Sequence, residues 1–482
     1  MLDIKNCNNN KINKKCIHIF RRDYRIIDNT SLISAGEKYK DIIPIFIFTY
    51  KQIRDNTLKS NACVKFLVES LEDLNKQLKK TTIGSRLRIY YGDEFQIIEN
   101  LIKSNPDIGA ISFNQDYTKY SKSRDNKITK IAYKHNIEVI CEDDYCLHPI
   151  GTITTGTGKT YTKFTPFYRK CLATNIRNVD TSQVRFVSGS DTISGHNEYT
   201  APLESMYDSN MLKDVELPEK GGRSEGLKIL SKISKGVWDD YNSQRDLLIY
   251  KTTHLSPYNK FGCLSIREIF HIAKKSLGID SGIIRQLIWR DFYYNLGDSN
   301  PQIFTGTMSA KFNKINWSTD TTKFNAWTNG KTGYPIVDAC IAEIKNTGYM
   351  HNRGRLIVSN FLVRILHQDW RKGEHWFAKM LYDYDPIQNN FGWEVNAAVS
   401  GTESRPLTQT ILNPWIQSKK YDPQAEYIKK WIPDLKDVKP EHLHRWDLHH
   451  SKYNLGDIGY LSPIVLYEDE RKKNIELYKK YI

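Results

Sequence analysis

The sequence predicts a parallel α/β domain followed by an all-helical domain. Short apolar runs alternate with amphipathic stretches over residues 15–147, and from residue 226 onward apolar residues recur at helical spacing. The stretch between them is rich in Thr, Ser, Gly and Asp and has no regular apolar pattern. We therefore expect a flexible lead-in (residues 1–14), a Rossmann-like α/β domain (15–147), an interdomain linker (148–225) and a helical domain (226–482).

Short, mostly apolar runs predict the strands of the first domain. They lie at residues 16–20, 43–48, 87–91, 108–113 and 137–141. Runs of this kind are typical of strands that are buried on both faces. Between the second and third runs, an apolar stripe at helical spacing predicts a helix within residues 62–80, formed by Leu67, Leu71, Leu74 and Leu78. This alternation of strand and helix predicts a parallel sheet with helical crossovers.

Apolar periodicity of the helical kind predicts the second domain. It recurs over residues 264–276, 281–296, 334–347, 355–370 and 424–433. All 10 Trp residues of the chain lie in this half, from Trp238 to Trp446. An α/β domain followed by a helical, Trp-rich domain is an uncommon arrangement.

Charge and aromatic content favour a nucleic-acid partner. The 482 residues include 70 Lys and Arg against 55 Asp and Glu, which gives a net charge of +15 at pH 7, and 12% of the residues are aromatic. A basic surface attracts a polyanion, and aromatic rings stack on bases. An AT-rich genome, which favours Lys, Asn, Ile and Tyr, is the alternative explanation of this composition.

Other features indicate a soluble intracellular protein, with cytoplasm and nucleus both open. No apolar run reaches the ~18 residues of a membrane span, and the first residues lack the apolar segment of a signal peptide. The 8 cysteines include no Cys-x-x-Cys pair and no zinc-binding spacing with paired histidines. We expect free thiols in a reducing compartment and no metal site.

The densest group of polar residues in the helical half lies at 347–355 and 383–393. Polar groups inside an apolar domain require partners, because an unpaired buried polar atom costs ~1–3 kcal/mol. Arg355 and Asp383 are expected to form a charge-assisted hydrogen bond. On physical grounds alone, an ordinary buried ion pair is the simpler interpretation.

Several long motifs follow one another along the chain. They are Trp289-Arg290-Asp291-Phe292-Tyr293, Trp327-x-x-Gly330-Lys-Thr-Gly333-Tyr-Pro335, Met350-His-Asn-Arg353 and Asn413-Pro414. This series resembles the photolyase/cryptochrome family over nearly the whole chain, and most of all the class I photolyases that act on cyclobutane pyrimidine dimers. The resemblance implies an N-terminal antenna-type domain, a long linker and a C-terminal helical domain that holds FAD.

The resemblance also implies which residues contact the flavin. They are Tyr241, Thr252, Thr253, Leu255, Ser256, Arg290, Asn352, Arg355, Asp383, Asp385 and Asn389. The group from Tyr241 to Ser256 corresponds to the diphosphate site. Asn389 matches the position that faces flavin N5, where repair enzymes usually carry Asn and many sensory members carry Asp or Cys. Asn389 therefore favours repair over signalling.

The implied activity is that of a deoxyribodipyrimidine photolyase. Photoexcited reduced FAD would transfer an electron to a cyclobutane pyrimidine dimer in DNA and split it, acting on a flipped-out dimer. The residues Trp393, Trp370 and Trp317 match the electron-transfer chain from flavin to surface. We expect the protein to act as a monomer on damaged DNA.

The same resemblance implies lesion contacts, and basic residues around the pocket are candidates for phosphate contacts. The DNA-binding residues that we expect are Gln286, Trp289, Asn352, Arg353, Arg245 and Arg405. Trp289 and Asn352 match lesion contacts, and the arginines are candidates for phosphate contacts. The lesion pocket diverges from the family pattern. Gln286 stands where Glu is usual, and Glu394-Val395-Asn396 replaces a second lesion-contacting Trp.

Two alternatives remain open for the function. One is a (6-4) photoproduct photolyase, although neither Asn352 nor Leu356 is the His of the animal-type enzymes. The other is a cryptochrome-like photosensor without repair. An antenna chromophore is also open: Asn114-Gln115 aligns with a folate-binding Asn-Glu pair, but Gln115 supplies no carboxylate. Folate, a deazaflavin or no antenna are all compatible with the sequence.

Overall fold

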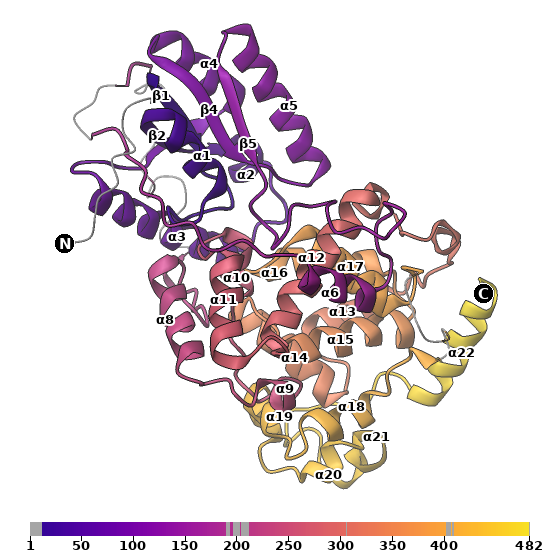
Figure 1. Cartoon of the computed structure of the whole chain (residues 1–482). Helices are drawn as coiled ribbons and strands as arrows, with labels where there is room; N and C mark the ends of the chain where they lie inside the picture. The colour runs from indigo at the N-terminus through magenta and orange to yellow at the C-terminus, as the bar shows by residue number, and fades with distance from the viewer. Residues whose placement is uncertain are drawn as a thin grey trace.

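The N-terminal domain of the computed structural model is built on one parallel sheet (Figure 1). The structure describes residues 12–188, 193–195, 203, 212–304, 306–401, 406 and 409–481. The sheet has the strand order β3-β2-β1-β4-β5. Its strands are β1 (Ile12–Ile19), β2 (Tyr39–Thr49), β3 (Arg88–Gly92), β4 (Ile108–Asn114) and β5 (Glu138–Glu142). The predicted strands and their parallel pairing are confirmed.

Helices cover both faces of this sheet, as the apolar runs predict (Figure 1). They are α1 (Thr30–Lys38), α2 (Tyr50–Ile53), α3 (Asn61–Thr81), α4 (Glu94–Ser104) and α5 (Lys119–Lys134). Along β2, Ile43 and Ile45 pack in the core with α4, whereas Ile42 and Phe46 pack with α1 and α3. The helix predicted within 62–80 is α3.

Short and long helices make up the C-terminal domain, which encloses a second apolar core. The helices are α8 (Arg223–Ser234), α9 (Tyr241–Gln244), α10 (Ser256–Phe261), α11 (Ile266–Leu277), α12 (Gly282–Ser299), η2 (Pro301–Phe304), η3 (Ala310–Lys314), α13 (Thr321–Asn329), α14 (Pro335–Thr347), α15 (Asn352–Asn360), η4 (Phe361–Ile365), α16 (Trp370–Met380), α17 (Pro386–Ala397), α18 (Pro414–Tyr421), α19 (Glu426–Trp431), η6 (Pro433–Leu435), α20 (Pro440–Leu443), α21 (Trp446–His449), η7 (His450–Lys452) and α22 (Tyr467–Lys479).

One predicted helix, 355–370, is wrong as a single element. Helix α15 ends at Asn360 and continues as the π-helical turn η4. The chain then reverses at His367, which has a φ of 56°, and Asp369 caps α16 by accepting a hydrogen bond from the backbone N–H of Arg371 at 3.0 Å. The apolar pattern runs on because the turn itself is buried, so periodicity alone does not reveal the break.

The segment predicted as a linker contains a helix, α6 (Phe164–Ala173). Its side chains Phe164 and Phe167 are buried, and the helix packs against α12 of the C-terminal domain (Figure 1). The sequence did not predict this helix, because it is short and follows a stretch rich in Thr and Gly. The domain boundaries at 147 and 225 stay a prediction.

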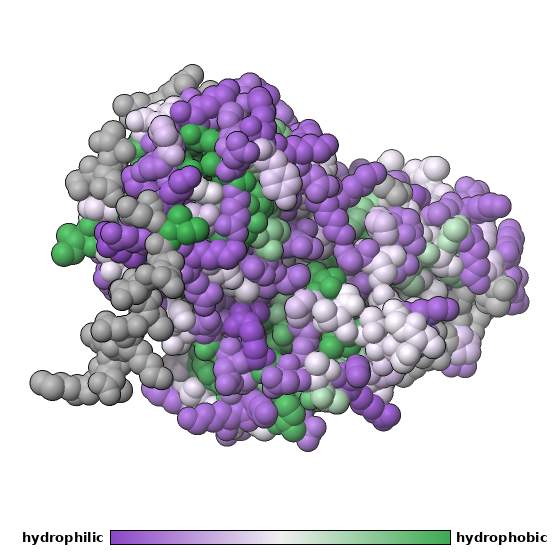
Figure 2. Space-filling view, turned by 45° about the horizontal axis from the view of Figure 1, so that its top comes forward, coloured by the Kyte–Doolittle hydropathy of each residue, from purple (hydrophilic) through white to green (hydrophobic). Residues whose placement is uncertain are grey.

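Buried ion pairs join the two domains. Arg267 of α11 donates to Asp28 at 2.7 Å and to Asp144 at 2.9 Å. Within the N-terminal domain, Arg25 donates to the same Asp144 at 2.6 Å. The face seen in Figure 2 is mainly hydrophilic, with hydrophobic residues in small separate groups. Within the described residues, no helix has both the length and the apolar character that a bilayer crossing requires.

Candidate functional site

A cavity of about 570 Å³ lies in the helical domain between α12, α15 and α17. Segments far apart in the sequence meet around it. Polar groups that converge on one pocket usually indicate a ligand site. The predicted site residues that line it are Tyr241, Arg245, Thr252, Thr253, Leu255, Ser256, Gln286, Trp289, Arg290, Asn352, Arg353, Arg355, Asp383, Asp385, Asn389 and Trp393. Trp370 and Trp317 lie outside this lining, and Arg405 lies outside the described residues.

One wall of the cavity carries hydroxyl groups and a guanidinium group. Thr252, Thr253 and Ser256 come from the loop before α10 and its first turn. Nearby, the Nη1 atom of Arg245 is buried and has no hydrogen-bond partner among the described residues. Gly282 allows the close approach, because a Cβ there would lie 3.2 Å from that Nη1 atom. A buried donor without a partner points to an anionic ligand at this wall.

Asp383 and Arg355 form the predicted charge-assisted pair at a second wall. The Nη2 atom of Arg355 donates to Oδ2 of Asp383 at 2.8 Å and to Oδ1 at 3.1 Å. Ser256 Oγ donates to the same carboxylate at 2.6 Å. The backbone carbonyl of Met350 accepts from Arg355 Nε at 2.9 Å, which fixes the guanidinium group. The expectation from the sequence is confirmed.

Asp385 connects the cavity with the N-terminal domain. Its carboxylate accepts hydrogen bonds from Tyr117 at 2.8 Å and Tyr294 at 2.6 Å, and it forms an ion pair with Arg22. Burial alone would raise the pKa of Asp385, but Arg22 and Tyr294 lower it to about 2. The carboxylate is therefore ionised, and it also caps α17. Arg22 and Tyr117 were not predicted, because only the tertiary fold brings them here.

Asn389 lies one turn further along α17 and lines the cavity. Its Nδ2 atom donates to the side chain of Glu374 at 3.0 Å and to the backbone carbonyl of the same residue at 3.2 Å. Burial raises the pKa of Glu374, which also accepts from Tyr384 at 3.1 Å. With the amide nitrogen held by α16, the amide oxygen is left for a group inside the cavity.

The indole of Trp393 lines the inner end of the cavity and is buried. Its ring lies 6.1 Å from that of Trp327, and Trp327 lies 5.0 Å from the half-buried Trp376. The predicted partner Trp370 is buried at the start of α16. In the part of the chain that the structure describes, its ring makes no close contact with Trp393 or Trp317. The ring contacts that link Trp393 to Trp327 and Trp376 were not predicted, because indoles in a core carry no distinguishing sequence pattern.

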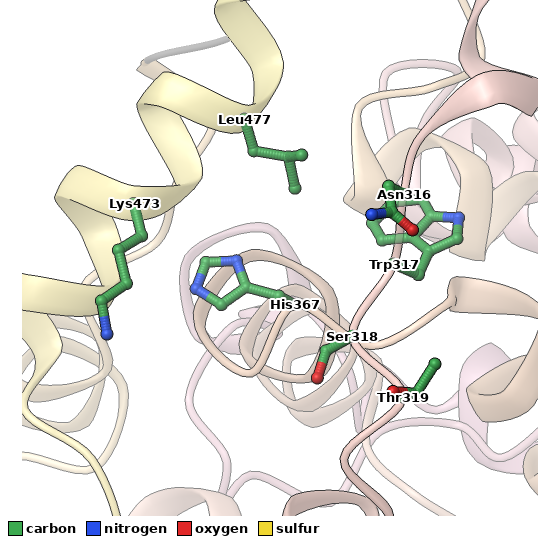
Figure 3. Close-up of a pocket in the computed structure, with 7 residues that line it drawn as sticks. All are labelled: Asn316, Trp317, Ser318, Thr319, His367, Lys473 and Leu477. Carbon is green, nitrogen blue, oxygen red and sulfur yellow. The ribbon is translucent and has the colours of Figure 1, made fainter.

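Trp317 lies at the surface beside a second, open pocket of about 450 Å³. Figure 3 shows Asn316 and Trp317 on one side of this pocket, with Lys473, His367 and Leu477 on the other. The indole is half-buried and meets the ring of Tyr478 edge-on, with 6.5 Å between the ring centroids. Solvent therefore has access to the Trp317 side of the helical domain.

The mouth of the main cavity is marked by residues that are exposed and yet line it. Gln286 and Asn352 are of this kind. The half-buried Trp289 and Leu356, one turn further along α12 and α15, line the cavity beside them, and Val395 lines it from α17. Arg353 is partly occupied, since it donates to Asp246 at 2.8 Å and lies 4.1 Å over the ring of Tyr421. The mouth thus combines amide, aromatic and cationic groups.

Similarity to known proteins extends over nearly the whole chain. Residues 283–480 match the FAD-binding domain of DNA photolyase, and residues 16–183 match DNA photolyase. The chain is 30% identical over 478 residues to the deoxyribodipyrimidine photo-lyase of a Synechococcus species, and the match covers 95% of each protein. The chain belongs to the photolyase/cryptochrome family. Helices α12, α15 and α17 lie almost entirely within the residues that match the FAD-binding domain, so the cavity between them is the candidate FAD site.

Solved photolyase structures share the fold. The archaeal photolyase of Sulfolobus tokodaii, which contains two FAD molecules, matches with a TM-score of 0.83 and 33% identity, over 97% of this chain and 100% of that one. A class III photolyase of Agrobacterium tumefaciens matches with a TM-score of 0.87 and 27% identity, over 98% of each chain. The predicted architecture of an α/β domain and a helical FAD-binding domain is confirmed.

FAD is the cofactor of the photolyase domain that this chain contains, and the cavity fits it. The cavity has hydroxyl and guanidinium groups at one wall, a fixed carboxylate at another and an indole at its inner end. Two buried donors, Arg245 Nη1 and Trp393 Nε1, have no partner among the described residues. A bound flavin nucleotide explains why such donors are left open in a buried site.

The antenna expected in some photolyases gains no support from Asn114. Its Oδ1 atom accepts from the backbone N–H of Ser31 at 3.0 Å, and its Nδ2 atom donates to Asp23 at 2.6 Å and Asn29 at 2.8 Å. These bonds use the amide within the N-terminal domain. Asn114 is therefore explained by the fold, and the identity of an antenna stays open.

Proposed function

We propose that this protein is a DNA photolyase that uses light to split cyclobutane pyrimidine dimers. One observation carries the proposal: residues suited to FAD and residues suited to a lesion line the same cavity, with Asn389 and Trp393 inside and Gln286, Trp289 and Asn352 at the mouth. An electron donor and a flipped-out base would therefore lie in the same cavity, with no segment of the described chain between them. Full-length similarity to deoxyribodipyrimidine photo-lyases supports the proposal.

FAD, when bound and reduced, supplies the light-driven electron for this chemistry. The chain's residues would hold it in place. Arg245 and the hydroxyl groups of Thr252, Thr253 and Ser256 suit the diphosphate, with Tyr241 and Leu255 beside them. The Asp383 carboxylate, neutralised by Arg355, suits a polar N–H edge of the ring system. Asn389 offers a neutral amide oxygen that carries no charge of its own into the site.

Residues at the mouth would bind the lesion. Extruding a damaged base pair costs a few kcal/mol, less than for an intact pair, and stacking on the Trp289 indole offsets part of this cost. The amides of Gln286 and Asn352 suit the carbonyl and N–H groups of pyrimidines. Arg353 and Arg405 remain candidates for the flanking phosphates. Arg245, also predicted as a DNA contact, suits the cofactor diphosphate instead, because its Nη1 atom is buried in the lining of the cavity. Arg290 donates to the backbone carbonyl of Tyr145 at 2.5 Å.

Trp393, Trp370 and Trp317 would supply electrons that keep the cofactor reduced. Trp393 borders the cavity, Trp370 is buried, and Trp317 reaches the surface beside the pocket of Figure 3. An inner indole that has lost an electron would be re-reduced by the next indole outward, and the outermost indole by a reductant in solution. We also propose that one chain acts alone, since one chain provides every group named for the reaction, and that it acts inside the cell, where DNA lies.

A repair assay tests the function and separates it from the alternatives. The holoprotein is reduced beforehand and given two oligonucleotides, one with a cyclobutane thymine dimer and one with a (6-4) photoproduct, in blue light and in the dark. The proposal predicts repair of the first only, and only in light. Repair of the (6-4) lesion instead would assign the alternative substrate, and repair of neither with FAD bound would favour a photosensor.

A further inference from the structure

The indole of Trp289 is stacked on a phenyl ring from the linker. The ring centroids of Phe164 and Trp289 lie 3.6 Å apart with an interplanar angle of 3°. Phe164 is the first residue of α6 and is 7% exposed. Neither cofactor binding nor the chemistry of repair accounts for this contact between the linker and the mouth of the cavity.

Further side chains hold this stack in place. The guanidinium group of Arg285 lies 5.0 Å over the ring of Phe164, on α12 one turn before Trp289. Phe292 meets both rings edge-on, at 5.8 Å from Phe164 and 5.7 Å from Trp289. Cation–π and edge-to-face contacts of this kind favour one orientation of the rings. The indole of Trp289 is therefore restrained before any ligand arrives.

Only one face of this indole is left for a ligand. Phe164 occupies one face, because the two rings are parallel and in van der Waals contact. Trp289 nevertheless lines the cavity. The face that can receive a stacked base is therefore the one opposite Phe164.

We propose that Phe164 is a positioning residue for the DNA lesion. It fixes Trp289 as a platform with a single free face, so that a flipped-out pyrimidine becomes the next layer after Phe164 and Trp289. Helix α6 of the linker thereby becomes part of the DNA-binding site. This inference rests on the proposed function and deepens it.

The physical gain lies in preorganisation. A Trp side chain that is free at the rim of a pocket loses rotamer freedom when a base stacks on it, and this loss weakens binding. Stacking on Phe164 removes that freedom in the unbound protein. The benefit should be seen in affinity for a flipped base and not in the electron-transfer step.

Substitution at position 164 tests the proposal with a matched control on the same helix. Phe164→Leu and Phe164→Met remove the parallel ring, while Phe164→Tyr keeps it. Phe167→Leu is the control, because Phe167 is also buried on α6 and packs on Phe292, while no ring contact joins it to Trp289 among the described residues. Each holoprotein is assayed for FAD content, KM and kcat with a dimer-containing oligonucleotide, and for binding of damaged and undamaged DNA.

The proposal predicts a KM about three- to tenfold higher in Phe164→Leu and Phe164→Met, as expected for the loss of one aromatic contact. FAD content, kcat and affinity for undamaged DNA should stay unchanged, and Phe164→Tyr should restore KM. An equal rise in Phe167→Leu would overturn the proposal, because general loosening of α6 would then explain it. If the wild type repairs no dimer in light, the proposed function fails, while the binding comparison still decides the role of Phe164.

Discussion

At the scale of single residues, the cavity is lined by carboxylates that have arginine partners and by an amide that is neutral. Asp383 and Asp385 each have an arginine partner, whereas Asn389 is held by Glu374 and contributes no charge. A buried carboxylate at position 389 would lie beside Glu374, whose pKa burial already raises. The amide thus allows the flavin to change its charge without opposition from this side.

We predict that Asn389→Asp makes the bound FAD harder to reduce. A negative charge within a few ångströms disfavours an anionic reduced cofactor, and the midpoint potential should fall by on the order of tens of millivolts. A redox titration of the holoprotein measures the shift. An unchanged potential together with unchanged photoreduction and repair would show that position 389 does not act on the flavin.

His351 gives a second prediction at this scale, concerning stability in acid. Burial lowers its pKa from 6.5 to about 4, and its Nδ1 atom accepts the backbone N–H of Arg353 as the cap of α15. The folded protein keeps this imidazole neutral while the unfolded chain binds a proton below pH 6.5. Stability due to this group is therefore lost as the pH falls from 6.5 toward 4.

We expect His351→Asn to remove this loss, because Asn also caps helices and does not titrate. Between pH 4 and 6.5, the slope of unfolding free energy against pH should decrease by up to about 1.4 kcal/mol per unit. Urea unfolding at several pH values measures it. Parallel curves for the variant and the wild type would mean that His351 is protonated equally in both states.

At the scale of elements, α17 places three functional groups on one side. Asp385, Asn389 and Trp393 follow at intervals of four residues, which aligns them along one helical face. The same helix therefore carries the link to the N-terminal domain, the amide and the indole at the inner end of the cavity. A shift of α17 would move all of them together.

We predict that Trp370→Phe slows photoreduction of FAD strongly but leaves repair intact when the cofactor is reduced beforehand. The indole is the relay, and phenyl is much harder to oxidise. The rate of photoreduction is measured from the flavin absorbance while the oxidised holoprotein is illuminated in the presence of a reductant. Trp327→Phe is the matched comparison, because the Trp327 ring, unlike that of Trp370 in the described part of the chain, lies in contact with Trp393. If Trp327→Phe slows photoreduction and Trp370→Phe does not, the assigned chain is incorrect.

The sequence allows some elements to be predicted better than others, for physical reasons. Buried strands such as 43–48 are recognisable because both faces must be apolar. The break after Asn360 is not, because the π-helical turn is as buried as the helix before it. The polar lining of the cavity follows from motifs. Phe164 and Trp327 could not be identified, since an aromatic residue in a core looks the same whether or not it serves a site.

At the scale of the whole molecule, the two domains meet at a charged joint close to the cofactor cavity. Arg22 and Tyr117 of the N-terminal domain reach Asp385, and Tyr294 of α12 reaches it too. The joint is buried, so its charges are poorly screened by solvent. Domain arrangement and cavity shape are therefore coupled through one carboxylate.

We predict that Asp385→Asn lowers the unfolding free energy by about 3 kcal/mol, because it leaves the Arg22 charge without its partner. Asn preserves the cap of α17, so the loss reports the joint and not the helix end. Chemical denaturation of the holoprotein measures it. Unchanged stability would indicate that Arg22 finds compensation elsewhere, for example at Asp116, 3.9 Å away.

The net charge of +15 leads to a prediction about DNA binding. Each phosphate contact contributes about 1 to the slope of log affinity against log salt. Arg353→Ala should reduce that slope by about 1, whereas Lys103→Ala on α4 should leave it unchanged. Fluorescence anisotropy at several salt concentrations gives both slopes. An equal slope in Arg353→Ala and the wild type would leave Arg353 with only its structural pair, Asp246.

In the proposed mechanism, FAD in the helical cavity drives repair of a dimer bound at its mouth. The most direct test is the wavelength dependence of dimer repair by the reduced holoprotein. Repair should follow the absorption spectrum of the bound reduced flavin and should be absent in the dark. Repair that proceeds in the dark, or no repair at any wavelength absorbed by the bound flavin, would rule this mechanism out.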